Sequence, residues 1–105
     1  MKIILMRHGQ AEDETRPDSA RQLTDFGQQQ AKQTAKYITT HYHPDYFLVS
    51  PYERAQQTLA KLQAQLPTVP SSIQDNLTPS DDARQALNEI ADIEAKCLVV
   101  VCHMS

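Results

Sequence analysis

The sequence has no tryptophan, only two glycines and no apolar run of the length needed to cross a membrane, which is about 18 residues. Its apolar start, residues 1–6, leads directly into Arg7 and His8 and is too short for a signal peptide. We therefore expect a cytoplasmic protein that has no membrane partner.

The sequence also lacks a large excess of charge of either sign. Ten lysines and arginines oppose thirteen aspartates and glutamates, which leaves a net charge of −3 at pH 7. We therefore expect no nucleic-acid partner, because such proteins carry a basic surface. In an acidic chain of this kind, any tight cluster of arginines is informative.

The two cysteines, Cys97 and Cys102, are too far apart to form a disulfide. They lie five residues apart in a predicted strand, which separates them by about 16 Å. A disulfide needs Cα atoms within about 7 Å of each other. Because the reducing cytoplasm also keeps thiols free, we expect two unpaired cysteines.

Four short segments predict the strands of a sheet. Three are apolar apart from Lys2, as expected of strands that are buried on both faces, and they lie at 2–6, 46–49 and 98–101. Residues 71–74 predict a short fourth strand.

Three stretches between these strands carry apolar residues at helical spacing. The first begins at Thr24, with Asp25 in its first turn, and its apolar stripe is Ala31, Ala35, Ile38 and Tyr42. The stripe of the second is Ala55, Leu59, Leu62 and Leu66. The third is expected over Asp81–Glu94, through Ala83, Leu87, Ile90 and Ile93.

Alternation of strands and helices predicts an α/β fold, in which helices flank a parallel or mostly parallel sheet. Residues 1–105 contain no linker or repeat and are interpreted as a single domain. The chain ends at Ser105, four residues after its most apolar strand, and such a strand needs neighbours on both edges. We expect the N-terminal part of a longer domain, and the alternative is a complete minimal domain.

Polar residues follow three of the predicted strands. Arg7, His8 and Gly9 follow the first, Arg54 lies just after the second, and His103 follows the last. Ligands of open α/β sheets bind at the carboxyl ends of the strands. Two histidines and two arginines are therefore expected on one rim of the sheet.

This set of residues suits phosphoryl transfer. The guanidinium groups of Arg7, Arg54 and Arg21 match the oxygens of a phosphoryl group in two-pronged fashion. Nearby positive charge keeps a histidine neutral, and hence nucleophilic at one ring nitrogen. Positioning and charge stabilisation carry most of the catalysis in this chemistry.

The ordered motifs resemble those of a known family. Residues 7–9 resemble the R-H-G signature of the histidine phosphatase (phosphoglycerate mutase-like) superfamily, residues 50–58 resemble its S-P-x-x-R-A-x-x-T segment, and residues 101–103 occupy the place of its V-G-H segment. The small size and the run at 21–24 are similar to the SixA-like phosphohistidine phosphatases. The resemblance covers essentially the whole chain and implies a three-layer phosphoglycerate mutase-like fold.

The resemblance also implies catalytic roles for four residues. His8 is the implied nucleophile, which would carry the phosphoryl group as a phosphohistidine intermediate. Arg7 and Arg54 would bind the phosphoryl oxygens, and His103 would donate a further hydrogen bond to them.

The implied substrate-binding set also includes Gly9 and Arg21. No metal or other cofactor is expected, because the arginines would supply the charge that Mg²⁺ supplies elsewhere. The proton donor to the leaving group stays open among Glu12, Asp13, Asp81 and Asp82, and the alternative is that all four are solvated surface charges.

We expect a metal-independent phosphohistidine phosphatase that acts in signal transduction on a protein, such as a histidine phosphotransfer domain or a phosphocarrier protein. Because the connections between the elements are short, we expect no segment to cover the site. An open site suits a phosphorylated side chain on a protein better than an enclosed small metabolite. The alternatives are a small-molecule phosphomonoesterase and a catalytically impaired phosphate-binding module. A metal-dependent hydrolase that uses His8 and His103 is disfavoured, since the arginines would repel a divalent cation.

Overall fold

The computed structural model describes residues 1–13, 16–81 and 83–103. In chain order its elements are β1 (Lys2–Arg7), the 3₁₀ helix η1 (Asp18–Ala20), α1 (Asp25–His41), β2 (Tyr46–Val49), α2 (Glu53–Gln65), β3 (Ser71–Ile73), α3 (Ala83–Ile90) and β4 (Cys97–Cys102).

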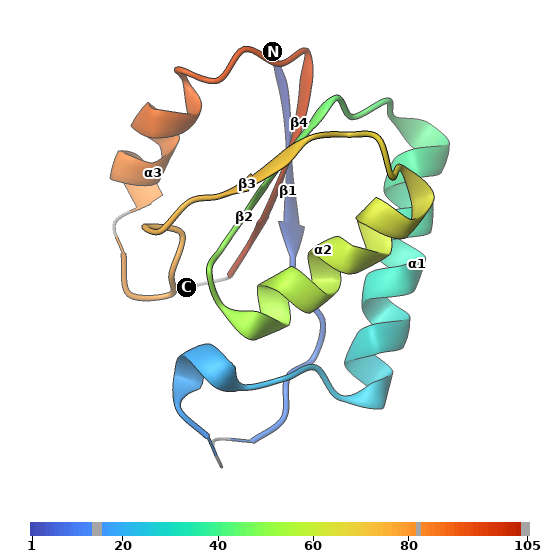
Figure 1. Cartoon of the computed structure of the whole chain (residues 1–105), viewed down its shortest axis with the longest axis vertical. Coiled ribbons are helices and arrows are strands. Elements are labelled where there is room, and N and C mark those ends of the chain that lie inside the picture. The colour runs from blue at the N-terminus through green and yellow to red at the C-terminus, as the bar shows by residue number, and fades with distance from the viewer. Residues whose placement is uncertain (14–15, 82, 104–105) are drawn as a thin grey trace.

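The strands form one sheet in the order β1-β4-β2-β3, and each neighbouring pair is parallel. The most apolar strand, β4, lies between β1 and β2, where Leu98 to Val101 are completely buried. All carboxyl ends therefore share one edge of the sheet, and the loop after β1 lies beyond that edge together with η1 (Figure 1). The predicted α/β class with a parallel sheet is confirmed.

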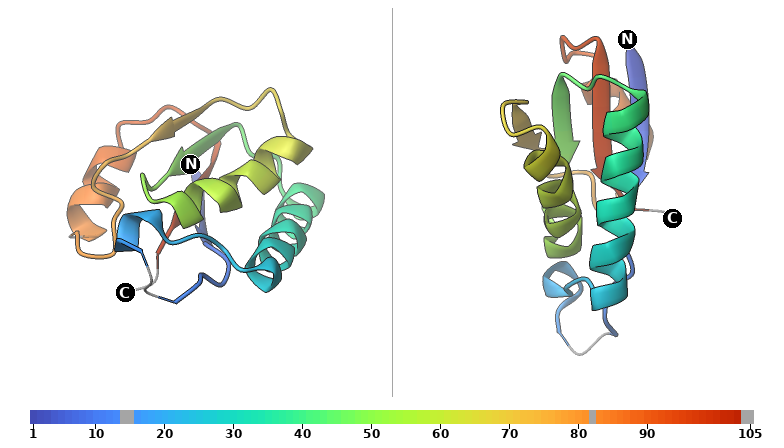
Figure 2. Two further views of the ribbon diagram at one scale, coloured as in Figure 1. Left: turned by 60° about the horizontal axis from the view of Figure 1, so that its bottom comes forward. Right: turned by 90° about the vertical axis from the view of Figure 1, so that its right-hand side faces the viewer.

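Alternate residues of the strands face two separate cores. One core joins the sheet to α1 and α2 and contains Met6, Ala35, Ile38, Phe47, Val49, Ala55, Leu59, Leu62, Val99 and Val101. The other joins the opposite face to α3 and contains Leu48, Ile90, Leu98 and Val100. Helices α1 and α2 lie side by side along one face of the sheet (Figure 2), so the chain forms three layers.

Helix α1 begins where the local sequence predicts. The side chain of Thr24 accepts a hydrogen bond from the backbone N–H of Gly27 at 2.9 Å, which satisfies one of the free donors of the first turn. Ala31, Ala35 and Ile38 are buried as expected. The helix ends at His41, and the last residue of the predicted stripe, Tyr42, is half-buried at its C-cap.

The prediction that β1 is buried on both faces is wrong. Met6 is only 2% exposed, whereas Ile3 is 41% and Leu5 65% exposed. The reason is topological. β1 is an edge strand, and α3 covers Leu98 and Val100 of the neighbouring strand instead of the outer side chains of β1.

The third helix is shorter than predicted. It ends at Ile90 rather than Glu94, because the backbone N–H of Ile93 bonds to the carbonyl of Ile90 at 3.0 Å and that of Asp92 to Glu89 at 3.2 Å. These three-residue hydrogen bonds tighten the chain into a turn. Ile93 still packs against the core on that face.

Cys97 and Cys102 are both free thiols, as predicted. None of the helices within the described ranges is both long enough and apolar enough to span a membrane.

Candidate active site

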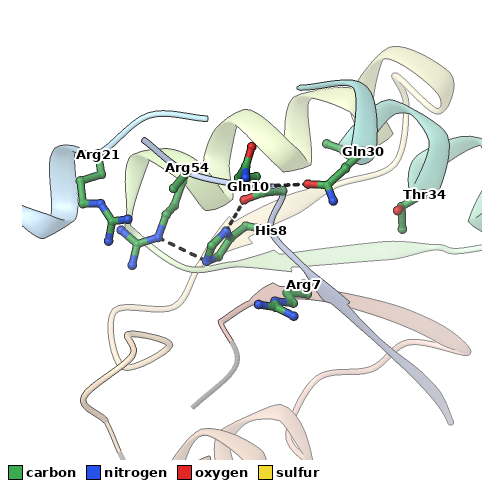
Figure 3. A pocket seen from close by; sticks show the side chains of 10 residues that line it. Arg7, His8, Gln10, Arg21, Gln30, Thr34 and Arg54 are labelled. Atoms are coloured by element: carbon green, nitrogen blue, oxygen red, sulfur yellow. Dashed lines mark hydrogen bonds between the residues drawn. The ribbon is translucent and has the colours of Figure 1, made fainter. Parts of the chain in front are cut away.

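A cavity of about 560 Å³ lies where β1 leads into its loop, beside α1 and α2. Figure 3 shows the side chains around it. It is lined by Arg7, His8, Gly9, Gln10, Ala11, Arg21, Gln30, Ala31, Thr34 and Arg54. Every site residue predicted from the sequence is therefore in its lining except His103, which adjoins it through His8.

The hydrogen bonds of His8 define which of its ring nitrogens is unprotonated. Nδ1 lies 2.7 Å from the carbonyl oxygen of Gly9. A carbonyl only accepts, so in the neutral ring Nδ1 carries the proton and Nε2 carries the lone pair. Nε of Arg54 donates to this Nε2 at 3.3 Å.

Burial is the largest cause that lowers the pKa of His8 below its ordinary 6.5. The hydrogen bond to the Gly9 carbonyl offsets part of this lowering, since it raises the pKa. The positive charges of three arginines lower it further, namely Arg54, Arg7 and Arg21. The ring is therefore neutral at pH 7, which is the state a nucleophile needs.

Arg54, in the first turn of α2, is only 4% exposed, and all three of its guanidinium nitrogens have hydrogen-bond partners. Its Nη1 donates to the backbone carbonyl of Asp18 at 2.6 Å, and its Nη2 lies 3.5 Å from the Asp18 carboxylate. Its Nε contacts His8. A buried guanidinium needs such partners, because desolvation of an unpaired charge is costly.

The structure adds Asp18, which no motif of the sequence predicted, to the site. Its carboxylate also accepts from Nη1 of Arg21 at 3.1 Å, and this hydrogen bond is the largest cause that lowers the Asp18 pKa. Arg21 is further held by the carbonyl of Glu12, at 2.9 Å from its Nε. The three-residue spacing of Asp18 and Arg21 was a usable signal, whereas the contact with Arg54 spans 36 residues.

His103 lies directly beside His8, with 4.9 Å between the ring centroids. Its Nε2 is 2.7 Å from Oγ of Ser50, and its Nδ1 is the only buried side-chain nitrogen or oxygen of the described residues without a hydrogen-bond partner. Burial, followed by the charges of His8 and Arg54, lowers the pKa of His103 to about 4. Both imidazoles are therefore neutral at pH 7.

Hydrogen bonds from the helices hold the loop that follows His8. The buried hydroxyl of Thr58 accepts from the backbone N–H of Gly9 at 3.2 Å. The side chain of Gln30 accepts from the backbone N–H of Gln10 at 2.8 Å. The contacts of Thr58, Gln10 and Gln30 could not be predicted from the sequence, because they join α2 and α1 to a distant loop.

The candidate proton donors lie outside the cavity lining. Glu12 pairs with Arg16 at 2.7 Å, Asp13 is exposed, and the exposed Asp81 accepts from Thr78 at 2.6 Å. The fourth candidate, Asp82, lies outside the described residues. Within the described ranges, no group of three or more histidine, cysteine or acidic side chains is placed to hold a metal ion.

Fold and site together define an α/β protein with an arginine-lined cavity, suited to a tetrahedral anion, around an unprotonated histidine. The chain belongs to the histidine phosphatase superfamily (branch 1), whose family model matches residues 3–81. The predicted family membership is thereby confirmed.

Three relatives of the chain carry the name SixA. The chain is 31% identical to a phosphohistidine phosphatase SixA homolog of Haemophilus influenzae, over 99% of this chain and 71% of that protein. A structure of the SixA protein of Nakamurella multipartitia matches with a TM-score of 0.84 and 28% identity, over 96% of this chain and 58% of that one. A structure of the protein histidine phosphatase SixA complexed with tungstate matches with a TM-score of 0.79 and 29% identity, over 99% and 70%. The chain thus spans 58% to 71% of the length of these relatives.

Proposed function

We propose that the chain is a phosphohistidine phosphatase in which Nε2 of His8 is the nucleophile. The observation that carries this proposal is the hydrogen bond between Nδ1 of His8 and the Gly9 carbonyl, which leaves Nε2 unprotonated inside a cavity lined by three arginines. A neutral nitrogen that faces fixed positive charge is suited to attack an electron-poor phosphorus.

The proposed reaction has two in-line steps. In the first, the lone pair of His8 Nε2 forms a bond to phosphorus, and the phosphorus–nitrogen bond of the substrate breaks. Its electron pair stays on the leaving imidazole, which already carries a proton on its other ring nitrogen and so leaves as a neutral ring. In the second, water attacks the phosphoryl group on His8, the new phosphorus–nitrogen bond breaks, and inorganic phosphate leaves. The ring of His8 returns to the neutral state in which it began.

The guanidinium groups would stabilise the charge on the phosphoryl oxygens in both steps. Arg54 already donates to His8 Nε2 through its Nε, so this edge of the guanidinium lies beside the place that the transferred group would occupy. Arg7 and Arg21 line the same cavity, and His103 would add a hydrogen bond from its place beside His8. Fixed donors of this kind act without reorganisation in the transition state.

A phosphohistidine substrate is also consistent with the positions of the candidate proton donors that the structure describes, which lie outside the cavity lining. A phosphoimidazole can leave already protonated and needs less help from a general acid than an alkoxide does. The relatives are named phosphohistidine phosphatase and protein histidine phosphatase, and one of them was solved with tungstate, a tetrahedral oxyanion like phosphate. We infer a phosphorylated protein as substrate, such as a histidine phosphotransfer domain or a phosphocarrier protein, and a role in signalling.

Competing substrates test this proposal. The full chain is assayed on a phosphorylated histidine phosphotransfer domain and on para-nitrophenyl phosphate, with and without EDTA. We expect kcat/KM for the phosphoprotein to be at least about 100-fold higher, equivalent to about 2.7 kcal/mol of transition-state binding, and EDTA to have no effect. A preference for the small ester would favour a phosphomonoesterase, and loss of activity in EDTA would favour a metal-dependent hydrolase. Phosphate binding without turnover would favour a binding module.

A further inference from the structure

Ser50 links the end of β2 to His103. The residue is completely buried, and its backbone N–H donates to the Val101 carbonyl at 3.1 Å, which continues the pairing of β2 with β4. Its Oγ lies 2.7 Å from Nε2 of His103 and accepts from the backbone N–H of Tyr52 at 3.2 Å. The ring of Tyr52 packs edge-on against that of His103, with 5.2 Å between centroids.

The direction of the hydrogen bond between Ser50 and His103 follows from the number of protons on each group. A neutral imidazole has one N–H, on either Nδ1 or Nε2. If Nε2 carried it, the ring would donate to Ser50, and the buried hydroxyl proton of Ser50 would have no acceptor among the described residues. If Nδ1 carries it, the Ser50 hydroxyl donates to Nε2 and both of its hydrogen bonds are satisfied.

The two arrangements also differ in what they leave at Nδ1. This atom is buried and has no hydrogen-bond partner among the residues that the structure describes. As a bare lone pair it would repel the oxygens of an anion bound beside His8, whereas as an N–H it is an unused donor. An unused buried donor is destabilising until it finds an acceptor, and a phosphoryl oxygen is such an acceptor.

We propose that Ser50 is a positioning residue, whose hydroxyl donates to Nε2 of His103 and holds that ring in the Nδ1–H form. Nδ1–H then becomes the donor to the transferred phosphoryl group. This inference rests on the proposed function and deepens it, because it assigns the hydrogen bond that sets the state of His103. At metal and catalytic sites, the hydrogen bond made by one ring nitrogen of a histidine likewise sets the role of the other.

The two adjacent imidazoles would thus both be protonated at Nδ1, but His8 would act as the nucleophile and His103 as a hydrogen-bond donor. The Gly9 carbonyl accepts a hydrogen bond from Nδ1–H of His8, so His8 offers its lone pair at Nε2 to phosphorus. The Ser50 hydroxyl occupies Nε2 of His103, so His103 offers its proton at Nδ1 to oxygen. One carbonyl acceptor and one hydroxyl donor distinguish the nucleophile from the anion donor.

Two-bond ¹H–¹⁵N correlation spectra of the ¹⁵N-labelled 105-residue chain test the tautomers directly. At about pH 8 both rings are neutral, and a His103→Asn variant assigns the signals of His103. We expect a protonated Nδ1 and a hydrogen-bond-accepting Nε2 on both His8 and His103. A protonated Nε2 on His103 alone would overturn the inference and leave the proposed function standing, whereas a protonated Nε2 on His8 would contradict the proposed nucleophile.

Substitution of Ser50 gives a second, kinetic test. We expect Ser50→Ala to move the His103 proton toward Nε2 and to lower kcat/KM by about 10- to 100-fold, which is less than the about 100- to 1000-fold loss of a complete anion donor. Ser50→Thr retains the hydroxyl and should restore the Nδ1–H spectrum. In a His103→Asn background, Ser50→Ala should cost less than about 3-fold, because the two changes would remove one interaction.

Ser72→Ala is the matched control. It removes an equivalent hydroxyl that accepts from the Tyr46 phenol at 2.8 Å on the exposed strand β3. We expect unchanged His103 signals and unchanged kcat/KM. Equal losses from Ser50→Ala in the presence and absence of His103, with the wild-type tautomer retained, would show that Ser50 acts on the fold and not through His103.

Discussion

Gly9 and Gly27, the only two glycines of the chain, lie against each other. A Cβ atom added to Gly9 would lie 2.2 Å from the carbonyl oxygen of Gly27, and one added to Gly27 would lie 2.0 Å from the carbonyl oxygen of Gln10. Neither glycine has a positive φ angle. Close approach of two backbones, and not an unusual backbone conformation, is therefore what requires glycine where the His8 loop meets α1.

We expect Gly27→Ala to separate α1 from the His8 loop. The contact is with backbone, which cannot swing aside, so the substitution should cost at least about 1–3 kcal/mol of the free energy of unfolding in spite of the higher helix propensity of alanine. Urea unfolding measures this loss. Gln29→Ala, on the exposed side of the same helix, is the control and should change stability by less than about 0.5 kcal/mol. A stabilised Gly27→Ala variant would contradict the packing account.

We expect activity to require both the charge of Arg54 and its forked guanidinium group. Its three nitrogens contact His8 and two groups of Asp18, and a lysine has one nitrogen for all of them. We expect Arg54→Lys to lower kcat/KM by about 100- to 1000-fold, the cost of one preorganised donor. The control is Arg16→Lys, which alters a half-exposed ion pair with Glu12 and should have little effect. Full activity of Arg54→Lys would show that charge alone is sufficient.

The pKa of His8 should respond to the charge at position 54. Arg54 is one of the groups that lower this pKa, so removal of its charge in Arg54→Gln should raise the pKa toward the ordinary 6.5, whereas Arg54→Lys should not. An NMR titration of the His8 ring measures this without any need for activity. In the wild type, kcat/KM should fall only below pH 6.5, as the nucleophile becomes protonated. An unchanged His8 titration in Arg54→Gln would contradict the assigned charge effect.

Stability should also fall in acid, because both site histidines have lowered pKa values. The unfolded chain binds protons at the ordinary 6.5, whereas folded His103 binds one only near pH 4. Between these values the unfolded state holds more protons, so the free energy of unfolding decreases as the pH falls from about 6.5 to about 4. Urea unfolding across this window should show a smaller decrease in His103→Asn. An equal decrease in both proteins would place the titrating group elsewhere.

Local patterns predicted the elements of this fold well, since each depends on nearby residues. The Thr24 cap, the buried stripe of α1 and the apolar run at 98–101 are all readable within one or two turns of chain. The exposure of Leu5 was not predictable from its own segment, because strand order decides which strand lies at the edge. An apolar run at an edge looks the same as one in the centre.

The residues of the candidate site also differ in whether local sequence could predict them. His8 and Arg54 could be proposed because each follows a strand and lies in a recognisable motif. The role of Asp18 depends on a contact with Arg54 across 36 residues, and that of Ser50 on a contact with His103 across 53. Such contacts appear only when the sheet brings the segments together.

The central claim is that the phosphoryl group passes through His8. Rapid mixing of the full chain with a ³²P-labelled phosphohistidine protein, followed by quenching in base, tests it most directly. We expect a transient label on the enzyme that is stable in base and labile in acid, present in His41→Ala and absent in His8→Ala, which should also lose turnover. Turnover by His8→Ala, or consumption of substrate by the wild type with no labelled enzyme at any time, would contradict the account.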